Sequence, residues 1–120
     1  MVPVPLHPRR KRERGFNQSA LLAAGLEKYL VIQSLEGALT RIRHTRPQVG
    51  LADADRLRNL QNAFRCGRRE LVDGKRVLLV DDVMTTGATA SSATLALRNA
   101  GARSVAVLTV ARAVPGAGRL

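Results

Sequence analysis

One stretch of the sequence constrains the fold more than any other: two apolar runs with a helix-length segment between them. Val77–Val80 contains no polar residue, and Ser104–Val110 is a second, largely apolar run. The intervening segment Ala88–Ala100 has the length of a helix, and Gly101 stands where a glycine commonly ends one. Parallel strands covered on both faces show such runs instead of a polar alternation. The pattern therefore predicts a βαβ unit with a buried parallel sheet, and so an α/β fold.

Two adjacent carboxylates, Asp81 and Asp82, are expected to end the first of these strands. In open α/β sheets, ligands bind outside the carboxyl ends of the strands. Neighbouring carboxylates repel each other and are costly to desolvate, so they are easiest to explain if sugar hydroxyls or a metal ion compensate them. The alternative is that the two acids only terminate a strand.

The loop that follows the acid pair is rich in small and hydroxylated residues. Its candidate phosphate-binding residues are Thr85, Thr86, Gly87, Ala88 and Thr89. The first N–H groups of a helix lack intrahelical partners and, with the positive end of the helix dipole, form an anion site. A Walker loop is excluded because Gly87 is not followed by lysine. Unless the threonines merely start a helix, an acid pair followed by a phosphate cradle is the order that a ribose 5-phosphate requires.

The rest of the chain is expected to complete a single domain. Its 120 residues suffice for one core, at about 2–112, followed by a tail at 113–120. The expected elements are an extended segment at Met1–Leu6, a basic turn, a helix at Phe16–Leu30, a short strand within Leu35–Ile42, and a long polar loop at His44–Asn62 with a helical turn at about Ala54–Leu60. Asn17 or Ser19 can cap the helix, and Leu22, Leu26 and Leu30 lie on one of its faces.

Several kinds of site and location are excluded by residue usage. No apolar run approaches the roughly 20 residues that span a bilayer. Prolines and a basic run stand where a secretory signal would be apolar. We therefore expect a cytoplasmic protein without membrane insertion. The single cysteine, Cys66, excludes an internal disulfide and a zinc site built on cysteine pairs.

The formal net charge of +11 implies an anionic partner but does not identify it. The basic residues cluster at 9–14, at 41–46 and at 65–69. Such clusters suit nucleic acid, including single-stranded DNA, or a small ligand with several phosphates, and they also suit a plain solvated surface. The scarcity of aromatic residues, 2% of the chain, argues against a platform that stacks unpaired bases.

At residues 77–89 the string VLLVDDVMTTGAT resembles the signature of type I phosphoribosyltransferases, which bind phosphoribosyl pyrophosphate (PRPP). The segments VPVPLHPRRKRERGFNQSALLA, RIRHTRPQVGLADADRLRNLQNAF and DGKRVLLVDDVMTTGAT resemble the ComF family specifically, over about Val2–Arg112. The resemblance implies a phosphoribosyltransferase-type, Rossmann-like, mostly parallel sheet flanked by helices. ComF-like proteins usually begin with a cysteine-rich, zinc-ribbon-like region, so we expect either that this chain is N-terminally truncated relative to them or that its start has been assigned late. We expect no zinc in this chain.

The resemblance also implies roles for positions in this sequence. Asp81 and Asp82 would hold the ribose hydroxyls, directly or through Mg²⁺, and the residues 85–89 would bind the 5-phosphate. The pyrophosphate loop would comprise Leu6, His7, Arg9 and Arg10. The mobile loop would span Arg43–Asn62, with Arg43, Thr45, Gln48, Arg56 and Asn59 as its candidate ligand-binding residues.

Three functions stay open at this point. The resemblance implies Mg²⁺-dependent transfer of a phosphoribosyl group to an unknown acceptor, with pyrophosphate displaced from ribose C1. A PRPP-binding module without transfer is the second. The third is an accessory protein of natural competence and DNA uptake, in contact with single-stranded DNA or with a protein of the competence machinery. Neither the acceptor nor the oligomeric state can be read from the sequence.

Overall fold

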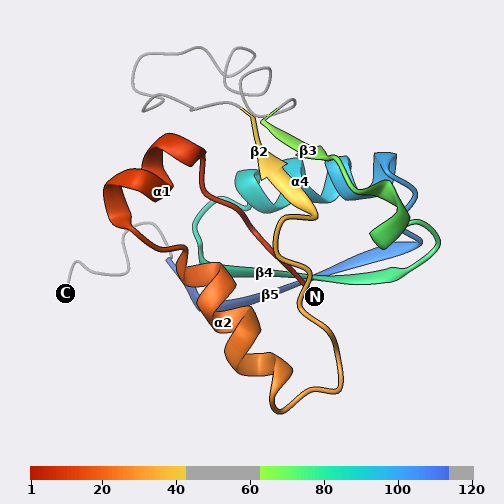
Figure 1. The fold of residues 1–120 in the computed structure, drawn as a ribbon, viewed down its shortest axis with the longest axis horizontal. Helices are drawn as coiled ribbons and strands as arrows, with labels where there is room; N and C mark the ends of the chain where they lie inside the picture. The colour runs from red at the N-terminus through yellow and green to blue at the C-terminus, as the bar shows by residue number, and fades with distance from the viewer. Residues whose placement is uncertain (43–62, 114–120) are drawn as a thin grey trace.

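The computed structural model describes residues 1–42 and 63–113. In chain order its elements are β1 (Val2–Pro3), α1 (Pro8–Arg14), α2 (Gln18–Glu27), β2 (Leu39–Arg41), β3 (Phe64–Cys66), a short 3-10 helix (Arg69–Leu71), β4 (Arg76–Met84), α4 (Ala88–Asn99) and β5 (Ser104–Arg112) (Figure 1). The long loop and helical turn expected at 44–62 lie outside the described residues, as does the tail from residue 114 onward.

The strands form two sheets. β1, β4 and β5 make a parallel sheet in that order, with Val2 opposite Leu79 and with β4 paired to β5 from Arg76 as far as Met84. β2 and β3 make a separate antiparallel pair. α4 connects β4 to β5, so the predicted βαβ unit and the α/β class are confirmed.

The two faces of the parallel sheet are covered by different helices, because successive side chains of a strand point to opposite faces. Leu79 of β4 is fully buried in a cluster with Ala93 and Leu97 of α4. Its neighbour Val80 packs in a second cluster with Ala23 of α2. Figure 1 accordingly shows α4 above the strands and α2 below them.

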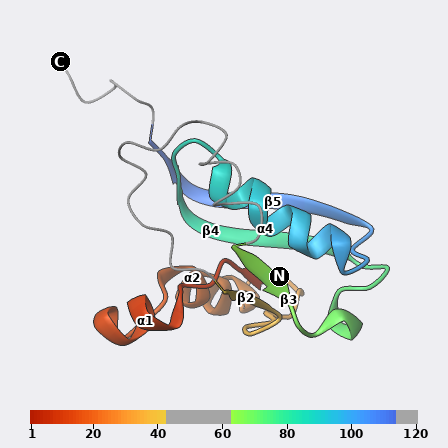
Figure 2. The ribbon, with the colours of Figure 1, turned by 90° about the horizontal axis from the view of Figure 1, so that it is seen from above.

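The β2–β3 pair lies against α4 and forms part of the larger core. Leu39 of β2 and Phe64 of β3 are buried with the residues of α4. The view from above shows this pair beside the N-terminal segment that carries α1 and α2 (Figure 2). This packing brings the end of β2 close to the end of β4, although the two are far apart in the sequence.

Two predictions about the strands are wrong. β4 does not end at Asp81 but continues to Met84, because its ladder with β5 runs on to the pair Met84–Arg112. β5 is not buried on both faces: it is the edge of the described sheet, and its side chains Leu108 and Val110 are 37% and 71% exposed. An apolar run indicates that a strand can be buried, but whether other elements cover the strand depends on the tertiary fold.

Two predictions about the helices also need correction. The expected basic turn is the helix α1, which has Pro8 at its first position, His7 as its N-terminal cap and Gly15, with φ of 81°, at its C-terminal end. The second helix is shorter than expected and ends at Glu27, so Leu30 lies beyond it and is 37% exposed. None of the helices in the described part of the chain is long and apolar enough to cross a membrane.

Candidate functional site

The acid pair lies in the second half of β4, close to the first turn of α2. Asp81 is buried, with 8% of its surface exposed. One of its carboxylate oxygens, Oδ1, accepts hydrogen bonds from the backbone N–H of Asp82 at 2.9 Å and from the hydroxyl of Ser19 at 3.4 Å. Asp82 is less buried, and its Oδ1 accepts from the backbone N–H of Val83 at 2.9 Å. The two carboxylates are therefore held by the strand itself and by α2.

Burial, the larger cause, and the neighbouring carboxyl of Asp82 together raise the pKa of Asp81 to about 6. The hydrogen bonds from Ser19 and from the backbone N–H of Asp82 oppose this shift without cancelling it. A carboxyl whose ionised form is disfavoured in this way gains from a cation or from hydroxyl donors placed beside it. Raised pKa values of this origin are common in functional sites.

The segment after β4 forms the predicted turn into α4. Gly87 precedes the helix with φ of 82°, a left-handed conformation that side chains disfavour. The hydroxyl of Thr86 accepts a hydrogen bond from the backbone N–H of Ala88 at 3.3 Å. Thr85 and Thr89 line a cavity that also contains the acid pair. The arrangement brings two of the predicted phosphate-binding side chains to the carboxylates.

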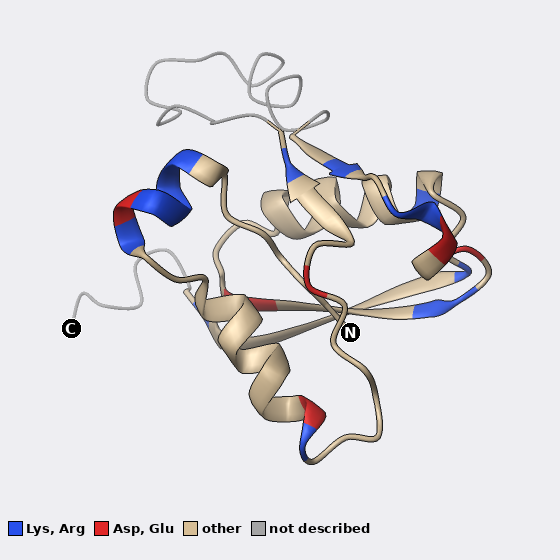
Figure 3. Ribbon diagram, viewed as in Figure 1, with Lys and Arg blue, Asp and Glu red and all other residues tan. Residues whose placement is uncertain are grey.

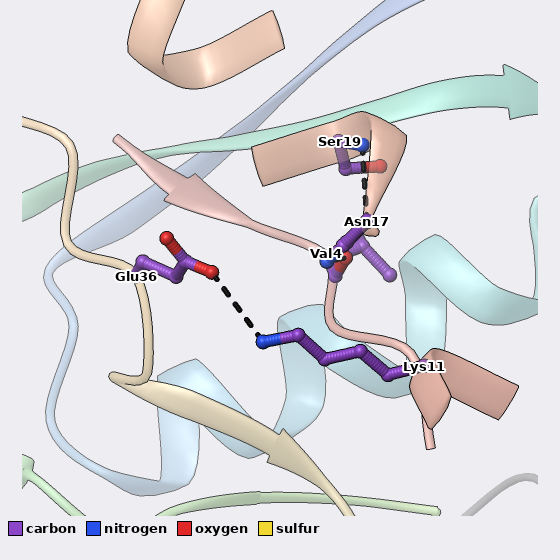
Figure 4. Close-up of polar contacts among 5 residues, drawn as sticks. All are labelled: Val4, Lys11, Asn17, Ser19 and Glu36. Carbon is purple, nitrogen blue, oxygen red and sulfur yellow. Dashed lines mark hydrogen bonds and ion pairs between the residues drawn. The ribbon is translucent and has the colours of Figure 1, made fainter. Parts of the chain in front are cut away.

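Asn17 fixes the segment that connects β1 to α1. Its side-chain amide donates to the carbonyl of Val4 at 3.0 Å, while its side-chain oxygen accepts from the backbone N–H of Ser19 at 3.0 Å (Figure 4). The same residue thus caps α2 and ties the end of β1 to it. Nearby, Lys11 of α1 forms an ion pair of 3.9 Å with Glu36, and both residues line a neighbouring cavity that does not include the acid pair.

A cavity of about 430 Å³ lies between α1, the start of α2, the end of β2 and the end of β4. This volume is typical of small-molecule sites. Its acidic and hydroxylated wall comprises Asp81, Asp82, Thr85 and Thr89. Its basic wall comprises Arg10, Arg14 and Arg41. Figure 3 shows the basic helix α1 at one side of the molecule, and the acidic stretch of β4 between α2 and α4 (Figure 3).

The predicted pyrophosphate-loop residues divide between the cavity and the surface. Leu6 and Arg10 line the cavity. His7 instead accepts a hydrogen bond from the backbone N–H of Arg9, at 3.2 Å, as the cap of α1. The side chain of Arg9 forms an exposed i,i+4 ion pair of 3.8 Å with Glu13. The helix explains this division, because only one of its faces points to the cavity.

Two cavity arginines were predicted only as members of basic clusters. Arg14 lies four residues after Arg10, so the helical period places both on one face. That signal was present in the sequence once a helix was recognised there. Arg41 reaches the cavity through the pairing of β2 with β3, which no local pattern reveals. The predicted mobile-loop residues Arg43, Thr45, Gln48, Arg56 and Asn59 lie outside the described residues.

A second, largely apolar cavity of about 400 Å³ adjoins the first. The two share Gln18, Asp82 and Val83, and the apolar one is completed by Leu21 and by the end of β5, among others. The acid pair therefore stands between a basic region and an apolar one.

The side chains of the cavity fit some metal ions and not others. Within residues 1–42 and 63–113, no group of three or more His, Cys, Asp or Glu side chains could hold one. Asp81 and Asp82 alone match Mg²⁺, which usually takes one or two protein carboxylates and completes its shell with water and substrate phosphates. The same pair does not match zinc, which prefers a fixed set of nitrogen and sulfur ligands.

Comparison with known proteins gives a family match over most of the chain. Residues 19–118 match the family model described as phosphoribosyl transferase domain. The chain is 40% identical to Competence protein F of Haemophilus influenzae, over 94% of this chain and 50% of that protein. It is 48% identical to the DNA utilization protein YhgH of Escherichia coli K12, over 93% of this chain and 48% of that protein.

Competence protein ComFC of Bacillus subtilis is a more distant relative, 34% identical over 93% of this chain and 44% of its own length. The chain thus spans about half the length of the curated relatives it matches. No solved structure matches the chain significantly.

Proposed function

Because the chain belongs to the phosphoribosyl transferase domain family, and within it to the ComF family, we propose that it binds PRPP with Mg²⁺ and transfers the phosphoribosyl group to an acceptor. The observation that carries the proposal is the composition of one cavity. Two carboxylates, two threonines and three arginines from four separate elements line it together.

Each chemical group of PRPP has a suitable partner among the side chains that line this cavity. Its two ribose hydroxyls can donate to the carboxylates of Asp81 and Asp82. Its 5-phosphate can accept from Thr85, Thr89 and the N–H groups at the start of α4. Its pyrophosphate carries the most charge and suits the wall that contains Arg10 and Arg14. A neutral sugar would leave the arginines without a function in the cavity.

Mg²⁺ would be held by Asp81 and Asp82 together with oxygens of the ligand. When bound, it supplies Lewis-acid stabilisation of charge on the departing pyrophosphate. The raised pKa of Asp81 supports this assignment, because a cation beside the pair would relieve the repulsion between the two carboxylates.

The side chains of the chain have binding and electrostatic roles in the proposed reaction. The bond between ribose C1 and the pyrophosphate oxygen breaks with its electron pair on the oxygen, and an acceptor nitrogen forms the new bond to C1. The arginines stabilise the negative charge that develops on the pyrophosphate. The acid pair fixes the ribose through its hydroxyls, so that C1 is presented in one orientation. No covalent intermediate with a protein side chain is needed.

Calorimetric titration of PRPP into the 120-residue chain, with and without Mg²⁺, tests this proposal. We expect saturable binding with Mg²⁺ and weaker binding when it is chelated. Release of pyrophosphate on addition of candidate acceptors would separate a transferase from a module that binds without transfer. The absence of PRPP binding at millimolar ligand with Mg²⁺ present would reject the proposal.

A second function, the handling of single-stranded DNA in competence, is favoured by the surface of α1. All seven residues of this helix are exposed, and five of them are basic. The names of two relatives, a competence protein and a DNA utilization protein, point in the same direction. Phosphate contacts from such a helix would bind DNA without base preference. The basic helix can serve DNA and PRPP alike, because Arg10 and Arg14 also line the cavity.

A further inference from the structure

Arg41 is the last residue of β2 and stands where two cavities meet. It lines the cavity of the acid pair and also a neighbouring cavity of about 340 Å³ beneath the segment that follows β1. Pro5, Leu6 and Asn17 line both cavities as well. Arg41 is therefore shared by the two cavities, together with these three residues.

The position of the Arg41 guanidinium is set by the antiparallel hairpin. Arg41 is directly opposite Phe64 in the β2–β3 register, and its guanidinium carbon lies 5.4 Å from the centre of the phenyl ring. This distance is within the range of a cation–π interaction. Phe64 is only 6% exposed and belongs to the core that also contains α4. The ring thus connects the guanidinium to the buried core that includes α4.

The charges around Arg41 form an environment suited to an anion. Arg10 and Arg14 of α1 line the same cavity, so three guanidinium groups from two elements face one space. Burial lowers the pKa of Arg41, the neighbouring Arg10 lowers it further, and Asp81 partly opposes both. Three like charges at the wall of one cavity repel each other, and a bound polyanion would relieve that repulsion. Arginine binds phosphate oxygens through two parallel hydrogen bonds, which lysine does not reproduce.

From this arrangement we propose that Arg41 is a third arginine of the pyrophosphate subsite and that Phe64 is its positioning residue. The assignment rests on the proposed PRPP-binding function and adds to it a residue that lies outside both the predicted pyrophosphate loop and the predicted mobile loop. Arg41 contacts the pyrophosphate, whereas the acid pair and the threonines contact the ribose and its 5-phosphate. Arg41 therefore selects for PRPP over ribose 5-phosphate, which has no pyrophosphate.

The test compares two ligands across a set of variants, by calorimetry at saturating Mg²⁺. For Arg41→Gln we expect PRPP affinity to fall about ten- to a hundredfold, while the affinity for ribose 5-phosphate changes less than about twofold. Arg41→Lys keeps the charge but loses the paired hydrogen bonds, so it should lie between the parent and Arg41→Gln. It also keeps the proposal testable if Arg41→Gln does not fold. Phe64→Leu should lower PRPP affinity about two- to fivefold, again without affecting ribose 5-phosphate.

Arg65→Gln is the matched control. Arg65 lies on the same hairpin, carries the same charge and is exposed outside the cavity, so this change should leave both affinities within about twofold of the parent. Equal losses for both ligands in Arg41→Gln, or an unchanged PRPP affinity in Arg41→Gln or Arg41→Lys, would overturn the role of Arg41. A parent chain that binds neither ligand would instead reject the proposed function.

Discussion

At the scale of single residues, Asp81 is where stability and ligand binding conflict most directly. The strand buries its carboxyl beside that of Asp82, and within the described residues the Ser19 hydroxyl and one backbone N–H donate to it. Selection for stability alone would favour a neutral side chain at such a position. The presence of a carboxylate here is explained if a ligand or a cation compensates it.

The raised pKa of Asp81 predicts how stability depends on pH. The folded-state pKa of about 6 exceeds the ordinary value of 3.8, so the folded chain binds this proton more tightly than the unfolded chain. This proton therefore stabilises the folded chain fully below about pH 4, and the stabilisation is lost as the pH rises through about 6. Relative to Asp81→Asn, the parent should lose about 1–3 kcal/mol between pH 4 and pH 7. Urea unfolding of both proteins at several pH values measures this, and a difference independent of pH would refute it.

PRPP affinity should depend on pH in the opposite sense, because ribose hydroxyls and Mg²⁺ require the ionised carboxylate. We expect the parent to bind PRPP more tightly as the pH rises from 5 to 7. The phosphates of PRPP also titrate in this range. Asp81→Asn is therefore the control, and its pH dependence should be visibly shallower. Superimposable pH profiles of the two proteins would show that Asp81 does not contribute.

At the scale of elements, the site depends on how the end of β1 is connected to α2 and to β4. Asn17 makes one of these connections, since it caps α2 and binds the carbonyl of Val4 at the same time. The backbone N–H of Val4 donates to the carbonyl of Val80 at 2.8 Å, which continues the pairing of β1 with β4 beyond the strand itself. The orientation of α1 relative to the acid pair follows from these bonds.

Asn17→Ala should therefore destabilise the chain by about 1–3 kcal/mol, since it removes both a helix cap and a backbone tie. Asn17→Ser keeps a capping oxygen but cannot reach Val4, so about half of this loss is expected. Thermal or urea unfolding of the three proteins measures the difference. Equal stability of Asn17→Ala and the parent would show that these two hydrogen bonds contribute nothing.

The sequence predicted the elements whose signals are local. β4, α4 and β5 follow from apolar runs and a terminal glycine, and the acid pair and threonine loop are contiguous in the chain. α1 has equally local signals, Pro8 and Gly15, but the prediction for its five basic residues, a turn, did not use them. The pairing of β2 with β3 and the exposure of β5 depend on tertiary neighbours. For the same reason Arg41 could not be assigned to the cavity from the sequence.

At the scale of the whole molecule, charge and apolar surface are segregated around the acid pair. The net charge is +11, and the exposed helix α1 carries five of the basic residues. On the other side of the pair lies the apolar cavity, with Leu21 62% and Val110 71% exposed. The chain spans about half the length of its curated relatives.

If the basic surface also serves DNA, single-stranded DNA should bind without base preference and should weaken steeply with salt. Because Arg10 and Arg14 line the cavity, PRPP should then compete with DNA for at least part of that surface. Fluorescence anisotropy of labelled oligonucleotides, at several salt concentrations and with saturating PRPP, measures both effects. DNA binding that is insensitive to PRPP would show that the two surfaces are separate.

The proposed binding of the PRPP ribose by the acid pair of β4 is tested most directly by replacing either acid. Asp81→Asn and Asp82→Asn keep the shape of the side chain and remove its charge. Each should lower PRPP affinity by about ten- to a hundredfold, the value of a charge-assisted hydrogen bond. Calorimetric titration of the parent and both variants, with melting curves for all three, gives affinity and stability separately. A loss of affinity in folded variants is the predicted result, and unchanged affinity in both would contradict the assignment of the site.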